Sequence, residues 1–304
     1  MAWPTLADDH PLLQLASRLP DLILAAQGHS TVWGISLSPS PAASTAPGGS
    51  ALKQPTFATL LVLQKFLRAH QGDVDEAAVA LGKTLDWRRE FGLDREDPER
   101  EKAVKNSKFD GLGYVTRLGT EGEGVIVCTW NIYGAANSNL KGVFGDLDTF
   151  LKWRVDLMER SIAAILAPVL QASTPEQEAD LAPIPDFGEG ADPYQGYQVH
   201  DYLNVSMLRM DPDVKAASKK TIELMGAHYP EWLSRKFFVS VPLVMSWVFQ
   251  AMRLIVSAET TRKLTVVSYK SNLAGEFGAS VKRADVPKEY GGTSDKSLDQ
   301  LSIQ

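Results

Sequence analysis

The chain has 304 residues, of which 44% are hydrophobic and 22% are charged. These values are ordinary for a soluble globular protein with one large and one smaller domain. The net charge of −6 argues against a nucleic-acid binder, which needs a basic face. The single cysteine, Cys128, excludes an internal disulfide framework and fits a reducing compartment. Its place in the apolar run GVIVCTWNIY predicts a buried, inert thiol.

The N-terminal part of the chain is predicted to be helical. Residues 9–29 have the pattern of short helices, and residues 36–55 form a Pro/Ser/Ala/Gly-rich stretch that predicts a disordered loop. Two longer helices are expected at 57–72 and 73–92. Asp73 has the spacing of an N-cap, and the second helix ends at a glycine.

From residue 109 the hydrophobic periodicity changes to a mixture of strands and helices. Two strands at 111–119 and 124–133 precede a long helix at 146–170. Residues 172–196 are acidic and Pro-rich, which predicts a solvated excursion. The later predicted elements are strands at 197–208, 236–242 and 263–268 and a helix at 211–231. Strands that alternate with helices predict an α/β domain with a mostly parallel sheet.

One apolar segment has the composition of a membrane helix but not the length. The run VPLVMSWVFQAMRLIVS, residues 241–257, falls short of the ~20 apolar residues needed to span a bilayer. Gln250 and Arg253 also interrupt it. Asp8 and Asp9 stand where a secretory signal would have basic residues, so we expect neither a signal nor an integral membrane protein.

The predicted strand YQVHDYLNVSML places an imidazole beside a phenol. Side chains two residues apart share one face of a strand, so His200 and Tyr202 point the same way as Gln198. Val199 and Asp201 point the other way. A buried phenol or imidazole without a partner costs about 1–3 kcal/mol. The residues alone favour side chains that bond to each other, to water or to a ligand.

Three further charged positions are ambiguous from local pattern. Arg88 follows Leu85 on the apolar stripe of its helix, and in isolation it predicts a snorkelling side chain. Glu231 follows the helix that ends at Pro230, where carboxylates are usually solvated. Thr260 and Lys263, in the segment ETTRK, have the composition of a capped turn.

The order of these pieces resembles the CRAL-TRIO family of lipid-binding proteins, which includes phosphatidylinositol transfer proteins. A Trp–Arg pair ends a helix, the block HYPE…KFF…P follows, and the resemblance closes on PKEYGG, so that it covers about residues 55–292. It implies an N-terminal helical region at 1–105, a lipid-binding domain at 106–292 that carries the acidic loop as an insertion, and a tail at 293–304. It also implies an apolar pocket floored by the sheet, with residues 242–257 as a helical lid.

The resemblance implies a phosphatidylinositol site. Family members hold the headgroup with an Arg, a Glu, a Thr and a Lys, and the matching residues here are Arg88, Glu231, Thr260 and Lys263. Two cations suit a phosphate diester, and a carboxylate suits inositol hydroxyls. The resemblance therefore implies phosphatidylinositol as the partner, transient contact with membrane surfaces, and a cytoplasmic protein associated peripherally with endoplasmic reticulum or microsomal membranes.

The H-x-Y strand departs from the usual family pattern and resembles a fungal subgroup. Most members have hydrophobic–Asp–Leu–x–Gly, whereas this chain keeps Asp201 but has His200, Tyr202 and Asn204. The runs FLRAHQGDVDEAA and TLDWRREF are also similar to that subgroup, which binds haem b. The resemblance implies ferric haem with Tyr202 as axial ligand and His200 adjacent as a possible ligand, and tyrosine ligation of haem is known in catalase.

The sequence leaves alternative functions open. We expect a non-enzymatic, haem-binding phosphatidylinositol transfer protein with no catalytic residues. The alternatives are a peroxidase- or catalase-like enzyme and a haem sensor without lipid transfer. Against an enzyme, the other histidines lie in the N-terminal part or at a helix end, away from a distal acid–base pair: His10, His29, His70 and His228.

Overall fold

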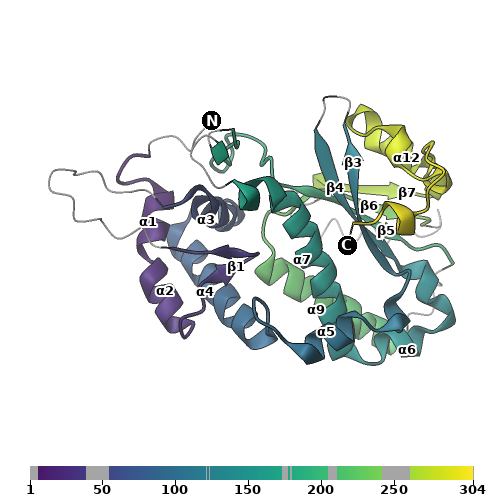
Figure 1. Ribbon diagram of the computed structural model, residues 1–304, viewed down its shortest axis with the longest axis horizontal. Helices are drawn as coiled ribbons and strands as arrows, with labels where there is room; N and C mark the ends of the chain where they lie inside the picture. Colours follow the sequence, from purple (N-terminus) through teal and green to yellow (C-terminus); the bar gives the residue numbers. More distant parts are fainter. Residues whose placement is uncertain are drawn as a thin grey trace. The chain divides into compact units, whose positions relative to one another are not determined.

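The computed structural model describes residues 6–38, 55–120, 122, 124–172, 177–178, 180–204, 211–241 and 261–303 (Figure 1). The chain divides into two compact units. Unit 1 contains residues 1–98, 166–194 and 222–231; unit 2 contains residues 99–165, 195–221 and 232–304. Most of the predicted disordered loop and all of the predicted lid at 242–257 lie outside the described residues.

Unit 1 begins with small helices and a short hairpin. Its first elements are α1 (Pro11–Ser17), α2 (Leu19–Ala25), β1 (Thr31–Val32), β2 (Ile35–Ser36), α3 (Phe57–Ala69) and α4 (Val74–Phe91). Trp33 and Gly34 join β1 to β2 with positive φ angles of 52° and 77°, the backbone that a tight two-residue hairpin turn requires. The two predicted longer helices are thus present.

The ends of α4 confirm the predicted caps. The Asp73 carboxylate accepts hydrogen bonds from the backbone N–H groups of Asp75 and Glu76, both at 2.9 Å. Gly92 ends the helix in the left-handed region at φ 77°, which glycine adopts without a Cβ clash. Short-range chemistry alone therefore fixes where this helix begins and ends.

The acidic loop contacts α3, so the predicted solvated excursion is wrong for the buried residues Ile184, Asp192 and Tyr194, although residues 187–191 are exposed. Arg68 donates to three backbone carbonyls of this loop, at distances from 2.7 to 3.1 Å. The fully buried Lys65 ammonium pairs with the Asp192 carboxylate at 2.8 Å. Ile184 and Tyr194 are also buried. Polar groups of a helix anchor this segment, which composition alone could not indicate.

Unit 2 contains the large sheet and the helices around it. Its elements are α5 (Pro98–Val104), β3 (Gly113–Gly119), β4 (Val125–Ile132), α6 (Leu140–Phe144), α7 (Leu147–Gln171), β5 (Gly196–Asp201), α9 (Pro212–His228), β6 (Leu233–Val239), β7 (Leu264–Val267), α12 (Leu273–Phe277) and α13 (Leu298–Leu301). Short 3-10 turns link them, among them η1 (Ser107–Phe109), η2 (Tyr133–Ser138), η4 (Lys270–Asn272), η5 (Gly278–Ser280), η6 (Arg283–Asp285) and η7 (Lys288–Tyr290). By residue assignment, α5, α7 and α9 each have residues in both units.

The sheet has the order β3-β4-β5-β6-β7. β3 and β4 pair antiparallel, and each later pair is parallel, which confirms the predicted α/β fold with a mostly parallel sheet (Figure 1). α7 packs on one face: a Cβ at Gly113 would come within 2.7 Å of Leu157. The other face carries a core in which Trp130 and Val199 pack with Phe277 of α12.

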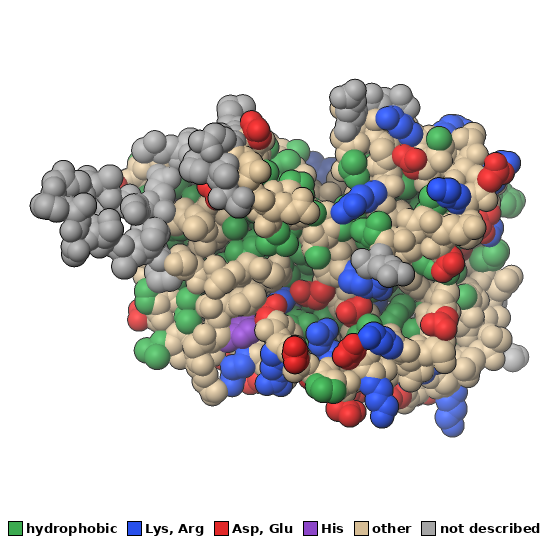
Figure 2. Space-filling model, viewed as in Figure 1, with side chains coloured by type: hydrophobic (Ala, Val, Ile, Leu, Met, Phe, Trp, Pro, Cys, Tyr) green, Lys and Arg blue, Asp and Glu red, His purple; other side chains and the backbone are tan. Residues whose placement is uncertain are grey.

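Charged side chains of both signs are interspersed on the face of the molecule shown in Figure 2. This mixture agrees with the modest negative charge of the sequence. Within the described ranges, no helix combines the length and apolar character needed to cross a membrane.

Candidate functional site

The two faces of β5 have different partners. On one face, Val199 is fully buried in the core with α12, and Tyr197 packs beside it. On the other face, the Tyr133 ring lies 5.6 Å from the His200 ring and 5.5 Å from the Tyr202 ring, centroid to centroid. Because one ring contacts both side chains, the predicted shared face of His200 and Tyr202 is confirmed.

The sheet register brings neighbouring strands to this face. Asn131 of β4 and Phe238 of β6 both pair with His200, so the three residues lie side by side across parallel strands. The Phe238 ring stacks on Tyr202 at 6.2 Å. β5 ends sooner than predicted, because the Asp201 carboxylate accepts the Leu203 N–H at 2.9 Å and Asn204 turns at φ 65°. Tyr202 therefore lies at the carboxyl end of a strand, where parallel sheets bind ligands.

His200 is a buried, neutral imidazole. Its side chain is 5% exposed, and its Nε2 lies 3.5 Å from the Gln198 amide oxygen, a long contact. Burial, followed by the charges of Lys236 and Arg154, holds the pKa of His200 well below its usual value. The ring therefore keeps a lone pair at neutral pH that can accept a hydrogen bond or coordinate a metal.

Tyr202 has a ring that packs and a hydroxyl without a described partner. Burial raises the pKa of Tyr202, and the neighbouring Tyr133 adds to this, so the isolated side chain is a neutral phenol. In the part of the chain that the structure describes, only the backbone N–H of Tyr202 makes a hydrogen bond, to the Val239 carbonyl at 3.0 Å. The interpretation that His200 and Tyr202 bond to each other is therefore wrong.

Two basic side chains contribute to the same face and were missed from the sequence. Arg154 of α7 is 2% exposed, and Lys236 of β6 pairs in register with Gln198. The charges of both side chains lower the pKa of His200. Arg154 could have been noticed, because it follows Phe150 by four residues on the buried stripe of its helix.

Asp201 lies on the opposite face, and both of its carboxylate oxygens accept a hydrogen bond. The Tyr290 hydroxyl donates to Asp201 Oδ2 at 2.9 Å, while the Leu203 N–H occupies Oδ1. The two glycines after Tyr290 pack closely against neighbouring backbone, where a side chain would not fit: a Cβ at Gly291 would lie 1.9 Å from the Ser271 carbonyl oxygen. The KEYGG motif thus closes the domain onto β5.

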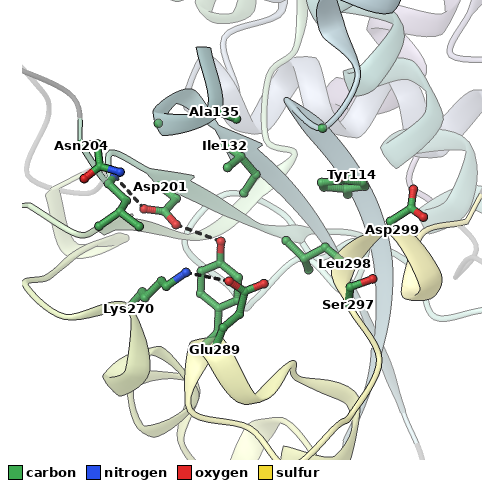
Figure 3. Close-up of a pocket in the computed structure, with 14 residues that line it drawn as sticks. Tyr114, Ile132, Ala135, Asp201, Asn204, Lys270, Glu289, Ser297, Leu298 and Asp299 are labelled. Carbon is green, nitrogen blue, oxygen red and sulfur yellow. Dashed lines mark hydrogen bonds and ion pairs between the residues drawn. The ribbon is translucent and has the colours of Figure 1, made fainter. Parts of the chain in front are cut away.

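A pocket of about 340 Å³ lies beside the hydrogen-bonded pair Asp201 and Tyr290 (Figure 3). Lys270 and Glu289, an ion pair at 2.6 Å, line one side of it, and Tyr114 and Asp299 line the other side (Figure 3). The Asp201 carboxylate and the Lys270–Glu289 pair already have partners. We therefore place the candidate site on the His200 face.

The four residues matched to the phosphatidylinositol headgroup are distributed along both units. Arg88 is fully buried in unit 1, where its guanidinium meets the Asp94 carboxylate at 2.8 and 2.9 Å, so the snorkelling interpretation is wrong. Glu231, also in unit 1, lies 3.8 Å from Arg68. Lys263 precedes β7 in unit 2, and Thr260 lies outside the described residues. The set as a headgroup site stays a prediction.

Cys128 is the buried thiol that the sequence predicted. It is fully enclosed, and burial raises its pKa well above the usual value, which makes a nucleophilic thiolate unfavourable. Among the described side chains, no group of three or more His, Cys, Asp or Glu residues could hold a bare metal ion.

Known proteins share both sequence and fold with this chain. Residues 195–292 match the CRAL/TRIO domain family. A protein of Cryptococcus neoformans var. neoformans serotype D (strain B-3501A) named phosphatidylinositol transfer protein SFH5 is 54% identical over 302 residues, covering 99% of this chain and 92% of its own. The chain belongs to the SFH5 family of CRAL/TRIO proteins.

A second SFH5 relative, from Phaeosphaeria nodorum, is 45% identical over 97% of this chain and 80% of its own. A crystal structure of Sfh5 aligns with 100% of this chain and 93% of its own, at 24% identity and a TM-score of 0.70. That structural likeness shows a shared fold. The CRAL-TRIO fold expected from the sequence is therefore confirmed.

Proposed function

We propose that the chain is a non-enzymatic carrier that binds phosphatidylinositol and presents or moves it between membranes. Its SFH5 relatives carry the name phosphatidylinositol transfer protein, and the sequence retains Arg88, Glu231, Thr260 and Lys263. We place it in the cytoplasm with peripheral, reversible association to endoplasmic reticulum membranes. The apolar run at 241–257 would supply the membrane contact.

We further propose that the His200 face binds ferric haem b. A porphyrin supplies four iron ligands itself, so one axial side chain is enough, and no larger ligand cluster is required. The described residues fit such a group. Phe238 and Val241 form an apolar cluster against which Tyr202 packs, which suits a flat, apolar ring system.

Tyr202 would hold the iron, and His200 would stand beside it. A hard phenolate oxygen favours Fe(III) over Fe(II), and bound haem supplies a redox-active iron and a visible chromophore. Neutral His200 can orient the phenolate by hydrogen bonding or contact the iron. The observation that carries this proposal is the Tyr202 hydroxyl, which has no hydrogen-bond partner among the described residues although aromatic rings surround it.

The haem proposal is tested by colour and by three variants. Purified protein should show a Soret band of ferric haem. Tyr202→Phe keeps the ring and should lose haem, whereas His200→Ala should weaken it by ~10–100-fold, as changes beside a metal ligand do. Tyr197→Phe, on the opposite face of the same strand, is the matched control and should retain haem. Wild-type protein that stays colourless when haem is supplied would reject the haem site.

The lipid proposal has a separate test. Lys263→Ala should strongly reduce phosphatidylinositol transfer between vesicles and leave the melting temperature nearly unchanged, because the polar contacts of a partly exposed lysine add little to folding. Lys141→Ala, an exposed cation on α6, is the control. Equal transfer by the Lys263 variant and wild type would contradict the headgroup assignment.

A further inference from the structure

Glu231 has an unusual backbone conformation. Its φ angle is 59°, in the left-handed region that residues with a Cβ rarely adopt. The Lys65 ammonium donates a hydrogen bond to the Glu231 carbonyl oxygen at 3.0 Å. A conformation of this kind persists only where the surrounding structure holds it, and such residues cluster at functional sites. The Lys65 bond is one of the contacts that hold the backbone of Glu231 in place.

Lys65 is itself fixed by other groups of unit 1. Its ammonium donates to the Asp192 carboxylate and to the Tyr194 carbonyl, both at 2.8 Å. Burial lowers the pKa of Lys65 to about 8, while the charge of Asp192 and, more weakly, that of Glu231 act in the opposite direction. The ammonium therefore remains mostly charged at neutral pH and supplies a rigid donor to the backbone of Glu231.

Arg68, three residues after Lys65 on α3, faces the carboxylate of Glu231. Its Nη1 and Nη2 donate to three carbonyls of residues 185–190, which fix the plane of the guanidinium. Its Nε is buried without a hydrogen-bond partner and lies 3.8 Å from Glu231 Oε2. This separation is too long for a hydrogen bond, so the two groups are held together by electrostatic attraction.

The attraction acts in a largely enclosed environment. The side chains of Arg68 and Glu231 are 9% and 15% exposed, and charges in such a place attract each other more strongly than charges on the surface. The small exposed part of Glu231 leaves room for contact with a ligand. An ionised carboxylate is a strong acceptor for hydroxyl groups, and it selects for them best when its position is fixed.

We propose that Arg68 is a positioning residue that fixes the Glu231 carboxylate, so that this carboxylate selects lipids whose headgroup carries hydroxyls. The proposal rests on the proposed function, in which Glu231 accepts hydrogen bonds from inositol. Arg68 does not need to touch the lipid, because it acts through Glu231. A fixed acceptor loses less conformational entropy on binding than a mobile one, and it therefore discriminates more strongly.

The test measures the preference for phosphatidylinositol over phosphatidylethanol, which has the same charged phosphate diester but no headgroup hydroxyls. Both lipids carry the same acyl chains and are presented in phosphatidylcholine vesicles. Glu231→Gln should reduce the preference about tenfold, because a neutral acceptor replaces a charged one. Arg68→Gln should reduce it in the same direction. Arg68→Lys keeps a cation at this position and should give a preference between those of wild type and Glu231→Gln.

Gln64→Leu is the matched control for the loop contacts of Arg68. Gln64 also donates to the acidic loop, at the Pro185 carbonyl and at Asp186 Oδ1, and its described hydrogen bonds go to the loop rather than to Glu231. The control should keep the wild-type preference. If it loses as much as Arg68→Gln, docking of the loop explains the effect and the positioning role is overturned. Circular dichroism checks that each variant folds, and Arg68→Lys supplies the comparison if Arg68→Gln does not.

The double variant separates positioning from a direct or general role. In a Glu231→Gln background, Arg68→Gln should change the preference by less than about twofold, because no carboxylate is left to position. Independent, additive losses would overturn the proposal. Failure of the proposed function has a different signature. If wild type shows no preference for phosphatidylinositol, or if Glu231→Gln keeps it, the headgroup role of Glu231 fails and the positioning role fails with it.

Discussion

Buried basic side chains occur in both units, but Lys65 of unit 1 and Arg154 of unit 2 differ in the hydrogen bonds that they make. In unit 1, Lys65 is completely enclosed, and its ammonium contacts the Asp192 carboxylate and the carbonyls of Tyr194 and Glu231, at 2.8 to 3.0 Å. In unit 2, Arg154 is almost as deeply buried, yet its Nε and Nη1 make no hydrogen bond. The first arrangement stabilises the fold, whereas the second leaves donors of a buried cation without a partner.

The physical difference lies in what removal would leave behind. Without Lys65, the buried Asp192 carboxylate would lose its counter-charge and two carbonyls would lose a donor. Without Arg154, no described group would lose a partner. The sign of the change in unfolding free energy should therefore distinguish a structural cation from a binding cation.

The largest effect is expected for Lys65→Met. Because the substitution strands the buried Asp192 carboxylate, it should lower the free energy of unfolding by about 3–5 kcal/mol. Urea unfolding followed by circular dichroism measures this. Lys83→Met, an exposed position on α4, should change it by less than ~0.5 kcal/mol. If Lys65→Met lowers the free energy of unfolding only slightly, Lys65 does not have the structural role that its contacts indicate.

Arg154→Met should have a smaller effect of the opposite sign. It replaces an unpaired buried charge with an apolar side chain, so protein freed of ligand should unfold at the same or a higher urea concentration, with a gain of about 1 kcal/mol. A ligand-free variant that is clearly destabilised would mean that Arg154 serves the fold.

The smallest effect concerns His228, which unit 1 accommodates by keeping it neutral. Its ring stacks on Trp87 at 4.3 Å, and burial, followed by the charge of Arg88, lowers its pKa to about 4. The unfolded chain therefore binds more protons between pH 4 and pH 6.5, and stability should fall as pH decreases through that range. Melting temperatures of wild type and His228→Gln, compared from pH 7 to pH 4, should converge at the acidic end.

Local signals explain what could be predicted from sequence. The Asp73 cap and the Gly92 stop depend on neighbours within a few residues, and both are present. The alternation of β5 is also local, and it placed His200 and Tyr202 on one face correctly. The same holds for Cys128, whose apolar flanks indicated its burial.

Long-range partners explain what could not be predicted. Arg68 donates to carbonyls 117 to 122 residues away, and backbone carbonyls have no signature in the sequence. The composition therefore predicts a solvated loop where the structure has one that is docked on α3. Arg154 stands visibly on the buried stripe of α7, but a helical pattern does not tell which strand residues it meets. The helical pattern does not show the Arg88–Asp94 pair, because Asp94 lies beyond the end of α4 and the turn there brings its carboxylate back to the helix.

The alternation along β5 has a consequence for how this scaffold can change its ligand. Asp201 and Val199 secure the strand to the closing segment through Tyr290 and to the core, while Gln198, His200 and Tyr202 face the other way. Substitutions at these three positions leave every contact of the securing face intact. Single substitutions on the His200 face can therefore change which ligand is bound while the contacts that hold β5 in the fold are kept.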